Sequence, residues 1–227
     1  MLSRLLSFQQ ADAAFPSGSF AFSNGIEGLV ASDPTFDSAS LIRALTGLVR
    51  FRWAETDRVA LILAHRIGTD PDHLGRIDAA VEAAALVESM RVGSRRNGAS
   101  LLTTHARLAT PGAEDLRAAI RAGHMLGHLA TVQGALWRAL GLSEPEAAAV
   151  AGYQLVSGLV SASVRLGQVG AIQGQKALQA VLPLVAEIAE RPLVEEPDGA
   201  IVLTGFTPLI EVAAMRHARA DLRLFAN

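Results

Sequence analysis

The sequence contains no cysteine, and this absence removes two kinds of structure at once. It excludes disulfide scaffolds and metal sites with thiolate ligands, and it is consistent with a cytoplasmic location. Aromatic residues make up only 5% of the 227 residues and charged residues only 19%, whereas half of the residues are hydrophobic. Such a chain can bury a sizeable core, and its wealth of alanine and leucine favours helices over strands.

The chain also lacks an excess of basic charge, since its formal net charge is −2. Nucleic-acid-binding domains usually carry such an excess, so we expect no nucleic-acid partner. The uncharged stretch 147–164 comes close to membrane-spanning length, but its glycines, serines, Tyr153 and Gln154 dilute its apolarity. A helix buried on all sides within a helical protein explains this stretch better. We therefore expect no membrane partner.

Motifs that carry catalysis are missing as well. The sequence has no G-x-x-x-x-G-K-[ST] phosphate loop, no G-x-S-x-G nucleophile turn and no G-x-G-x-x-G after a strand. The nearest approach to a phosphate loop, residues 174–177, lacks both the glycine spacing and the hydroxyl that would bind magnesium. The sequence therefore offers no case for an NTPase, a hydrolase or a Rossmann enzyme, and we expect no cofactor.

Helical periodicity is present from Ser38 onward. The predicted helices cover residues 38–49, 59–67, 71–90, 99–108, 113–122, 126–140, 144–166, 172–190 and 208–219, and Ser143 to Glu146 has the spacing of a capping box. Only Gly199 to Phe206 looks extended. We predict an all-α fold in which residues 1–227 form a single domain, a bundle of roughly eight to ten helices with an irregular N-terminal arm.

The arm contains the segment FPSGSFAFSNGIEG, residues 15–28, which follows neither a helix nor a strand pattern. Glycine allows tight turns and close backbone approach, and the apolar side chains of Phe15, Phe20, Phe22 and Ile26 indicate a loop pinned against helices. Within it, Glu27 is expected to satisfy a buried polar group or a helix start.

Two histidines offer an alternative function. His124 and His128 are four residues apart and could point two imidazoles at one metal ion if they lie on one helix. The competing interpretation is that one histidine is buried with a hydrogen bond while the other is exposed, because the sequence shows no third ligand. A small helical metal-binding protein and a generic helical interaction domain therefore remain alternatives.

The last twenty residues combine apolar side chains with arginines almost to the chain end. Because chain ends usually fray unless they dock, this tail either folds back on the core or is kept for a partner. Its composition does not decide between the two.

Four blocks spread over nearly the full length resemble the urease accessory protein F family. They are Asp12 followed by FPSGSFAFSNGIE; GH at 127–128 with GAL at 134–136 and ALGL at 139–142; LVSA at 159–162 with VRLGQ at 164–168 and GQ at 174–175; and PL at 208–209 with AMRH at 214–217 and RLF at 223–225. The departures from the family pattern are Gly170, Ala171, Glu211 and Ala218.

The resemblance implies a non-enzymatic scaffold, or chaperone, for nickel insertion into apo-urease. Members of this family form homodimers, bind the accessory protein called D (or H) and recruit the nickel-carrying GTPase called G, whose GTP hydrolysis they are thought to regulate. The missing phosphate loop agrees with this, because the nucleotide chemistry belongs to a partner. The resemblance makes the C-terminal tail the candidate for docking on D, and the tail residues concerned are Arg216, His217, Arg223 and Phe225. It makes Arg165 and Gln168 the candidates for contact with the GTPase.

Overall fold

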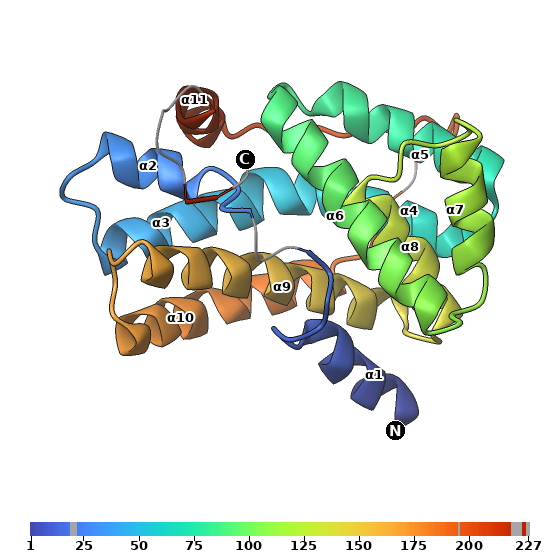
Figure 1. The fold of residues 1–227 in the computed structure, drawn as a ribbon, viewed down its shortest axis with the longest axis horizontal. Helices are drawn as coiled ribbons and strands as arrows, with labels where there is room; N and C mark the ends of the chain where they lie inside the picture. The colour runs from blue at the N-terminus through green and yellow to red at the C-terminus, as the bar shows by residue number, and fades with distance from the viewer. Residues whose placement is uncertain (19–21, 195, 219–223, 226–227) are drawn as a thin grey trace.

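The computed structural model describes residues 1–18, 22–194, 196–218 and 224–225, which fold into helices joined by loops (Figure 1). No strand occurs among the described residues, which confirms the all-α prediction. In chain order the elements are α1 (Leu2–Ala11), α2 (Ile26–Ser32), α3 (Ser38–Leu48), the π-helical segment η2 (Val49–Asp57), α4 (Arg58–Ile67), α5 (Pro71–Ala84), α6 (Glu88–Arg107), α7 (Ala113–Arg121), α8 (Leu129–Ala139), α9 (Glu144–Arg165), α10 (Ala171–Glu190) and α11 (Pro208–His217).

Several helices begin where the sequence carries a capping residue. Ser143 and Glu146 form the predicted capping box, with Ser143 N donating to Glu146 Oε2 at 2.9 Å and Glu146 N donating to Ser143 Oγ at 3.4 Å. Asp37 opens α3 in a similar way, because its carboxylate accepts the Ser40 N–H at 2.8 Å. These side chains satisfy backbone N–H groups that a helix start leaves unpaired, so they fix where the helix begins.

The prediction of one helix from residue 71 to residue 90 is wrong. α5 ends at Ala84, the backbone is extended at Val87, and α6 begins at Glu88. The predicted helix 99–108 is therefore only the second half of α6. At the break Val87 is buried while Leu86 is exposed. Neither glycine nor proline marks this turn, so the usual stop signals are missing from the sequence.

The segment Gly199 to Phe206, expected to be extended, forms no strand. It runs along η2, where Thr204 N donates to Glu55 O at 3.1 Å and Phe206 N donates to Phe51 O at 2.8 Å. These bonds satisfy backbone N–H groups of the segment without a neighbouring strand. They also bring Phe206 next to Phe51 on the surface that the site below uses.

Two helices precede the first one predicted, at residue 38. α1 packs on α9 and is anchored by the buried side chain of Gln10, and α2 begins at Ile26 inside the glycine-rich segment. Residues 12–18 and 22–25 form no regular element, as expected of an irregular arm. Phe22 and Ile26 are buried and Phe15 packs against the core, which confirms that the segment is pinned; Phe20 lies outside the described residues.

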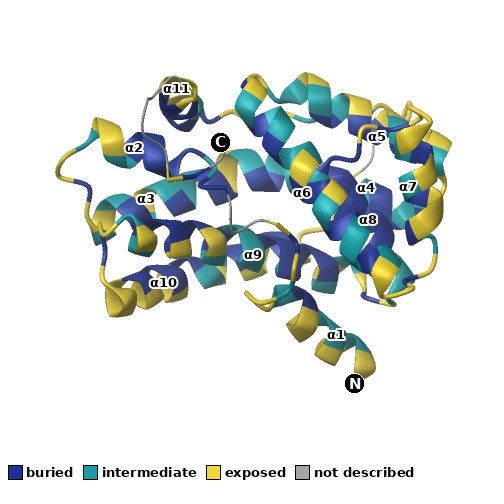
Figure 2. Cartoon of the chain, in the orientation of Figure 1, coloured by how far each residue is buried: buried dark blue, intermediate teal, exposed yellow. Residues whose placement is uncertain are grey.

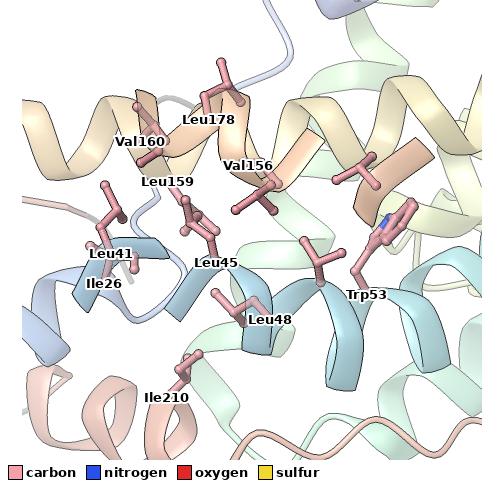
Figure 3. Close-up of a cluster of buried hydrophobic side chains, with 14 of the residues drawn as sticks. Ile26, Leu41, Leu45, Leu48, Trp53, Val156, Leu159, Val160, Leu178 and Ile210 are labelled. Carbon is pink, nitrogen blue, oxygen red and sulfur yellow. The ribbon is translucent and has the colours of Figure 1, made fainter. Parts of the chain in front are cut away.

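Two clusters of buried hydrophobic side chains fill the bundle. Figure 2 marks the buried residues in dark blue along the helices. One joins α2, α3, η2, the start of α6, α9, α10 and α11, and Figure 3 shows Leu45, Trp53 and Ile210 among its members. The other joins α4, α5, α6, α7, α8 and the first turns of α9. α9 contributes Val156 to the first cluster and Val150 to the second, and α6 likewise contributes Met90 to the first and Leu101 to the second, so these two helices connect the halves of the bundle.

Among the described residues, α9 is the helix whose length and composition would allow it to cross a membrane. In the stretch that meets this criterion, 56% of the residues are buried inside the protein. A helix in the core of a bundle meets the same criterion, so the finding is weak evidence for a membrane span.

Candidate functional site

The last described helix, α11, has two unlike faces. Its buried face consists of Ile210, Ala213, Ala214 and His217, which follow the i, i+3, i+4, i+7 spacing of a helix packed on a core. On the opposite face the side chains of Leu209, Val212 and Met215 are 73%, 40% and 47% exposed. Apolar side chains gathered on an exposed helix face are typical of a protein-binding surface.

A groove of about 570 Å³ lies beside this face, between α2, α3 and α11. Phe51 and Phe206 line it and are both more than half exposed, and Leu209 links the groove to the α11 face. Exposed aromatic side chains are frequent anchors in protein interfaces. We call the five residues Phe51, Phe206, Leu209, Val212 and Met215 the α11 surface.

Glycines of the segment 15–28 hold α11 in place. A Cβ atom at Gly28 would lie 2.2 Å from the carbonyl oxygen of Ala213, and one at Gly25 would lie 2.7 Å from Cγ2 of Ile210. Gly25 also has a φ of 91°, a conformation that other residues rarely adopt. Only glycine at these two positions lets α2 and α11 approach so closely. The segment therefore positions the α11 surface.

Glu27 connects α2 to residues 224–225, the part of the C-terminal tail beyond residue 218 that the structure describes. The carboxylate is buried, and it accepts the Leu224 N–H at 2.7 Å through Oε1 and the Phe225 N–H at 3.1 Å through Oε2. Nε2 of His217 lies 3.0 Å from Oε2, close enough for an ion pair although not aligned as a hydrogen bond. The expectation that Glu27 satisfies buried polar groups is confirmed, and those groups belong to the tail.

The ring of Phe225 is buried, and the guanidinium carbon of Arg165 lies 4.4 Å from its centroid. A cation over an aromatic face is worth about 0.5–2 kcal/mol, so this contact adds to the hold on the tail. Gln168, the other candidate for contact with the GTPase, is exposed just beyond the end of α9. The described part of the tail is thus docked on Glu27 of α2 and Arg165 of α9.

This docking changes the interpretation of the candidate tail residues. His217 is 5% and Phe225 4% exposed, so in this conformation neither side chain is accessible to a partner. His217 pairs with the carboxylate of Glu27, and Phe225 lies against the guanidinium of Arg165, so both side chains contact the chain's own core. Arg216 is exposed beside Met215 and stays a candidate, whereas Arg223 lies outside the described residues.

The two histidines of the metal-binding alternative do not share a helix, because α8 begins at Leu129. His128 is its N-cap residue and is fully buried, with Nε2 2.8 Å from Glu82 Oε2 and Nδ1 3.1 Å from Ser94 Oγ. His124 is exposed in the turn before it. The i, i+4 helical geometry that the metal-binding alternative requires is therefore absent, and the competing interpretation, one buried histidine with hydrogen bonds and one exposed histidine, is confirmed. In the part of the chain that the structure describes, no group of three His, Asp or Glu side chains could hold a metal ion.

A further buried histidine, His105, belongs to a polar network beneath α1. Its Nδ1 lies 2.9 Å from Thr110 Oγ1 and its Nε2 3.1 Å from Gln10 Oε1, which also accepts Trp137 Nε1–H at 3.1 Å. Burial lowers the pKa of His105 to about 4, because a protonated ring would lose its hydration. A neutral His105 therefore helps to anchor α1 to the bundle.

Sequence reasoning missed part of the α11 surface. Phe51 falls between two predicted helices and Phe206 in the segment predicted to be extended, and nothing local shows that they meet. Leu209, Val212 and Met215 did carry a signal, because their spacing of three residues places them along one side of the helix, away from the buried Ile210 and Ala214. Contacts between distant segments come from the tertiary fold, so a single sequence does not show them.

The fold and the α11 surface define an all-helical protein with an exposed apolar face. The model of the UreF family matches residues 35–182. The chain is 33% identical to the urease accessory protein UreF of Cereibacter sphaeroides over 99% of both chains, and 33% identical to that of Kocuria rhizophila over 96% of this chain and 94% of the relative. It is 30% identical to the same protein of a Bacillus species over the full length of both. The chain belongs to the UreF family of urease accessory proteins.

Proposed function

We propose that this chain is a non-enzymatic scaffold of urease maturation that binds the accessory protein D (or H) and the nickel-carrying GTPase G. In this proposal the assembly docks on apo-urease, and the scaffold modulates GTP hydrolysis by G while nickel is delivered as cargo. Family membership supports the urease context, because the relatives are named as urease accessory proteins. We place the scaffold in the cytoplasm as a single-domain homodimer. Light scattering tests the oligomeric state, because a homodimer has twice the 23.8 kDa mass of one chain.

The observation that carries the proposal is the α11 surface. Its five side chains expose roughly 500 Å² of apolar area, if a large side chain offers about 200 Å² when fully exposed. A standard interface buries about 800 Å² on each partner, and it consists of an apolar centre with a polar rim. The α11 surface is large enough to be that centre. We assign it to the D partner, because it adjoins the tail that the family resemblance assigns to D.

The contact with the GTPase is assigned to the end of α9. Gln168 is exposed there, and Arg165 lies on the same helix end, where it holds the ring of Phe225. The surface that a GTPase contacts at this corner would therefore differ between the docked and the undocked tail.

A double substitution tests the proposed surface. Leu209→Asp with Met215→Asp places two charges on the exposed face of α11 and leaves its buried face intact. We expect co-purification with D to fall by about thirtyfold or more, since removal of an interface anchor costs at least about 2 kcal/mol. The matched control is Ile172→Asp, an exposed apolar residue on α10. Equal binding of D by a folded double variant and the control would contradict the assignment.

A further inference from the structure

The buried carboxylate of Glu27 lies outside the α11 surface but contacts the C-terminal tail. We infer that Glu27 is a positioning residue, which fixes α11 and the C-terminal tail as one partner-binding surface by accepting the two tail amides and pairing with His217. The inference rests on the proposed function only for the identity of the partner. What Glu27 does to the tail can be measured without any partner.

The first support is the chemistry of the carboxylate. A carboxylate that is only 8% exposed is costly to bury unless hydrogen bonds or an opposite charge compensate it. Here the compensation comes from Leu224 N, Phe225 N and His217 Nε2, all of which belong to α11 or the tail. Glu27 and the tail therefore stabilise one another, because an undocked tail leaves the carboxylate poorly satisfied.

The second support is the place of Glu27 in the chain. It lies in the first turn of α2, between Gly25 and Gly28, the two glycines that admit α11. His217 is the last residue of α11, so one carboxylate contacts both the end of that helix and the residues that follow the stretch 219–223. A shift of Glu27 would therefore move α11 and the tail together.

The third support is the side chain that the docked tail presents. The Leu224 amide is held by Glu27 while its side chain stays 56% exposed. The docked tail thus adds another exposed apolar side chain at the corner where α11 ends. Release of the tail would remove Leu224 from this corner and would uncover the buried ring of Phe225.

Glu27→Gln tests the inference with nearly the same shape. The amide keeps one acceptor oxygen, but it replaces the other with a donor and removes the charge that faces His217. Because the chain contains no cysteine, Leu224→Cys provides a unique site for a fluorescein label on an exposed side chain. Glu190→Gln, an exposed residue at the end of α10, is the matched control. His217→Gln serves as a second variant if Glu27→Gln does not fold.

We expect Glu27→Gln to lower the fluorescence anisotropy of the labelled tail and to weaken binding of D by unlabelled chain about tenfold or more. The control should change neither quantity. Unchanged anisotropy in Glu27→Gln would overturn the inference, and so would lower anisotropy with undiminished binding of D. If the wild-type chain fails to bind D, the proposed function is refuted, while the anisotropy still decides whether Glu27 holds the tail.

Discussion

Replacement of Gly28 by alanine is expected to destabilise the protein, although alanine is the better helix former. The new Cβ atom would lie 2.2 Å from the carbonyl oxygen and 2.6 Å from the carbonyl carbon of Ala213, whereas ordinary contacts begin at 3.4 Å. The obstacle is backbone, so relief requires α11 to move by about 1 Å or more. Overpacking costs about 1–3 kcal/mol and the helix preference of alanine returns at most about 1 kcal/mol. We expect a net loss of about 1–2 kcal/mol.

Gly158→Ala is the matched control for this prediction. Gly158 is an exposed residue within α9, and a Cβ atom there would meet nothing within 4 Å. The substitution should therefore stabilise the protein by about 0.5–1 kcal/mol. Urea denaturation of both variants gives the two free energies of unfolding. Changes of the same sign would refute the argument that α2 and α11 require glycine for their close approach.

Two further predictions concern the core and a helix start. Because burial holds the pKa of His105 at about 4 against 6.5 in the unfolded chain, the unfolded state binds the proton first, and stability is lost as the pH falls below 6.5. Urea denaturation should show about 2 kcal/mol of this loss by pH 5, and His105→Gln should remove it; an equal pH dependence in both proteins would contradict the assignment. Ser143→Ala removes the capping box of α9 and should cost about 1 kcal/mol in thermal denaturation, whereas the exposed Ser161→Ala should cost less than about 0.5 kcal/mol.

Helices with a local start signal could be predicted from the sequence. Ser143 with Glu146, Asp37 and Asp70 each cap a helix in the structure at the place that the sequence indicates. The reason is physical: a capping side chain bonds backbone N–H groups two or three residues away, so the whole interaction is contained in a few neighbouring residues. The helical class of the fold follows from many such local preferences.

Features that depend on distant segments could not be predicted in this way. The break between α5 and α6 buries Val87 without any glycine or proline, so packing decides it. The docking of the tail depends on Glu27, which is almost two hundred residues earlier in the chain. A pairing of this kind shows only in the folded protein. For this reason the composition of the tail does not show whether it folds back on the core or is kept for a partner.

The most direct test of the proposed scaffold function is reconstitution with purified partners. The chain, the D protein and the GTPase G from one organism would be mixed and separated by size-exclusion chromatography with light scattering, after circular dichroism has shown that each is folded. The account predicts that all three co-elute in one complex, and that Leu209→Asp with Met215→Asp releases D from it. Separate elution of the three folded wild-type proteins would contradict the central claim.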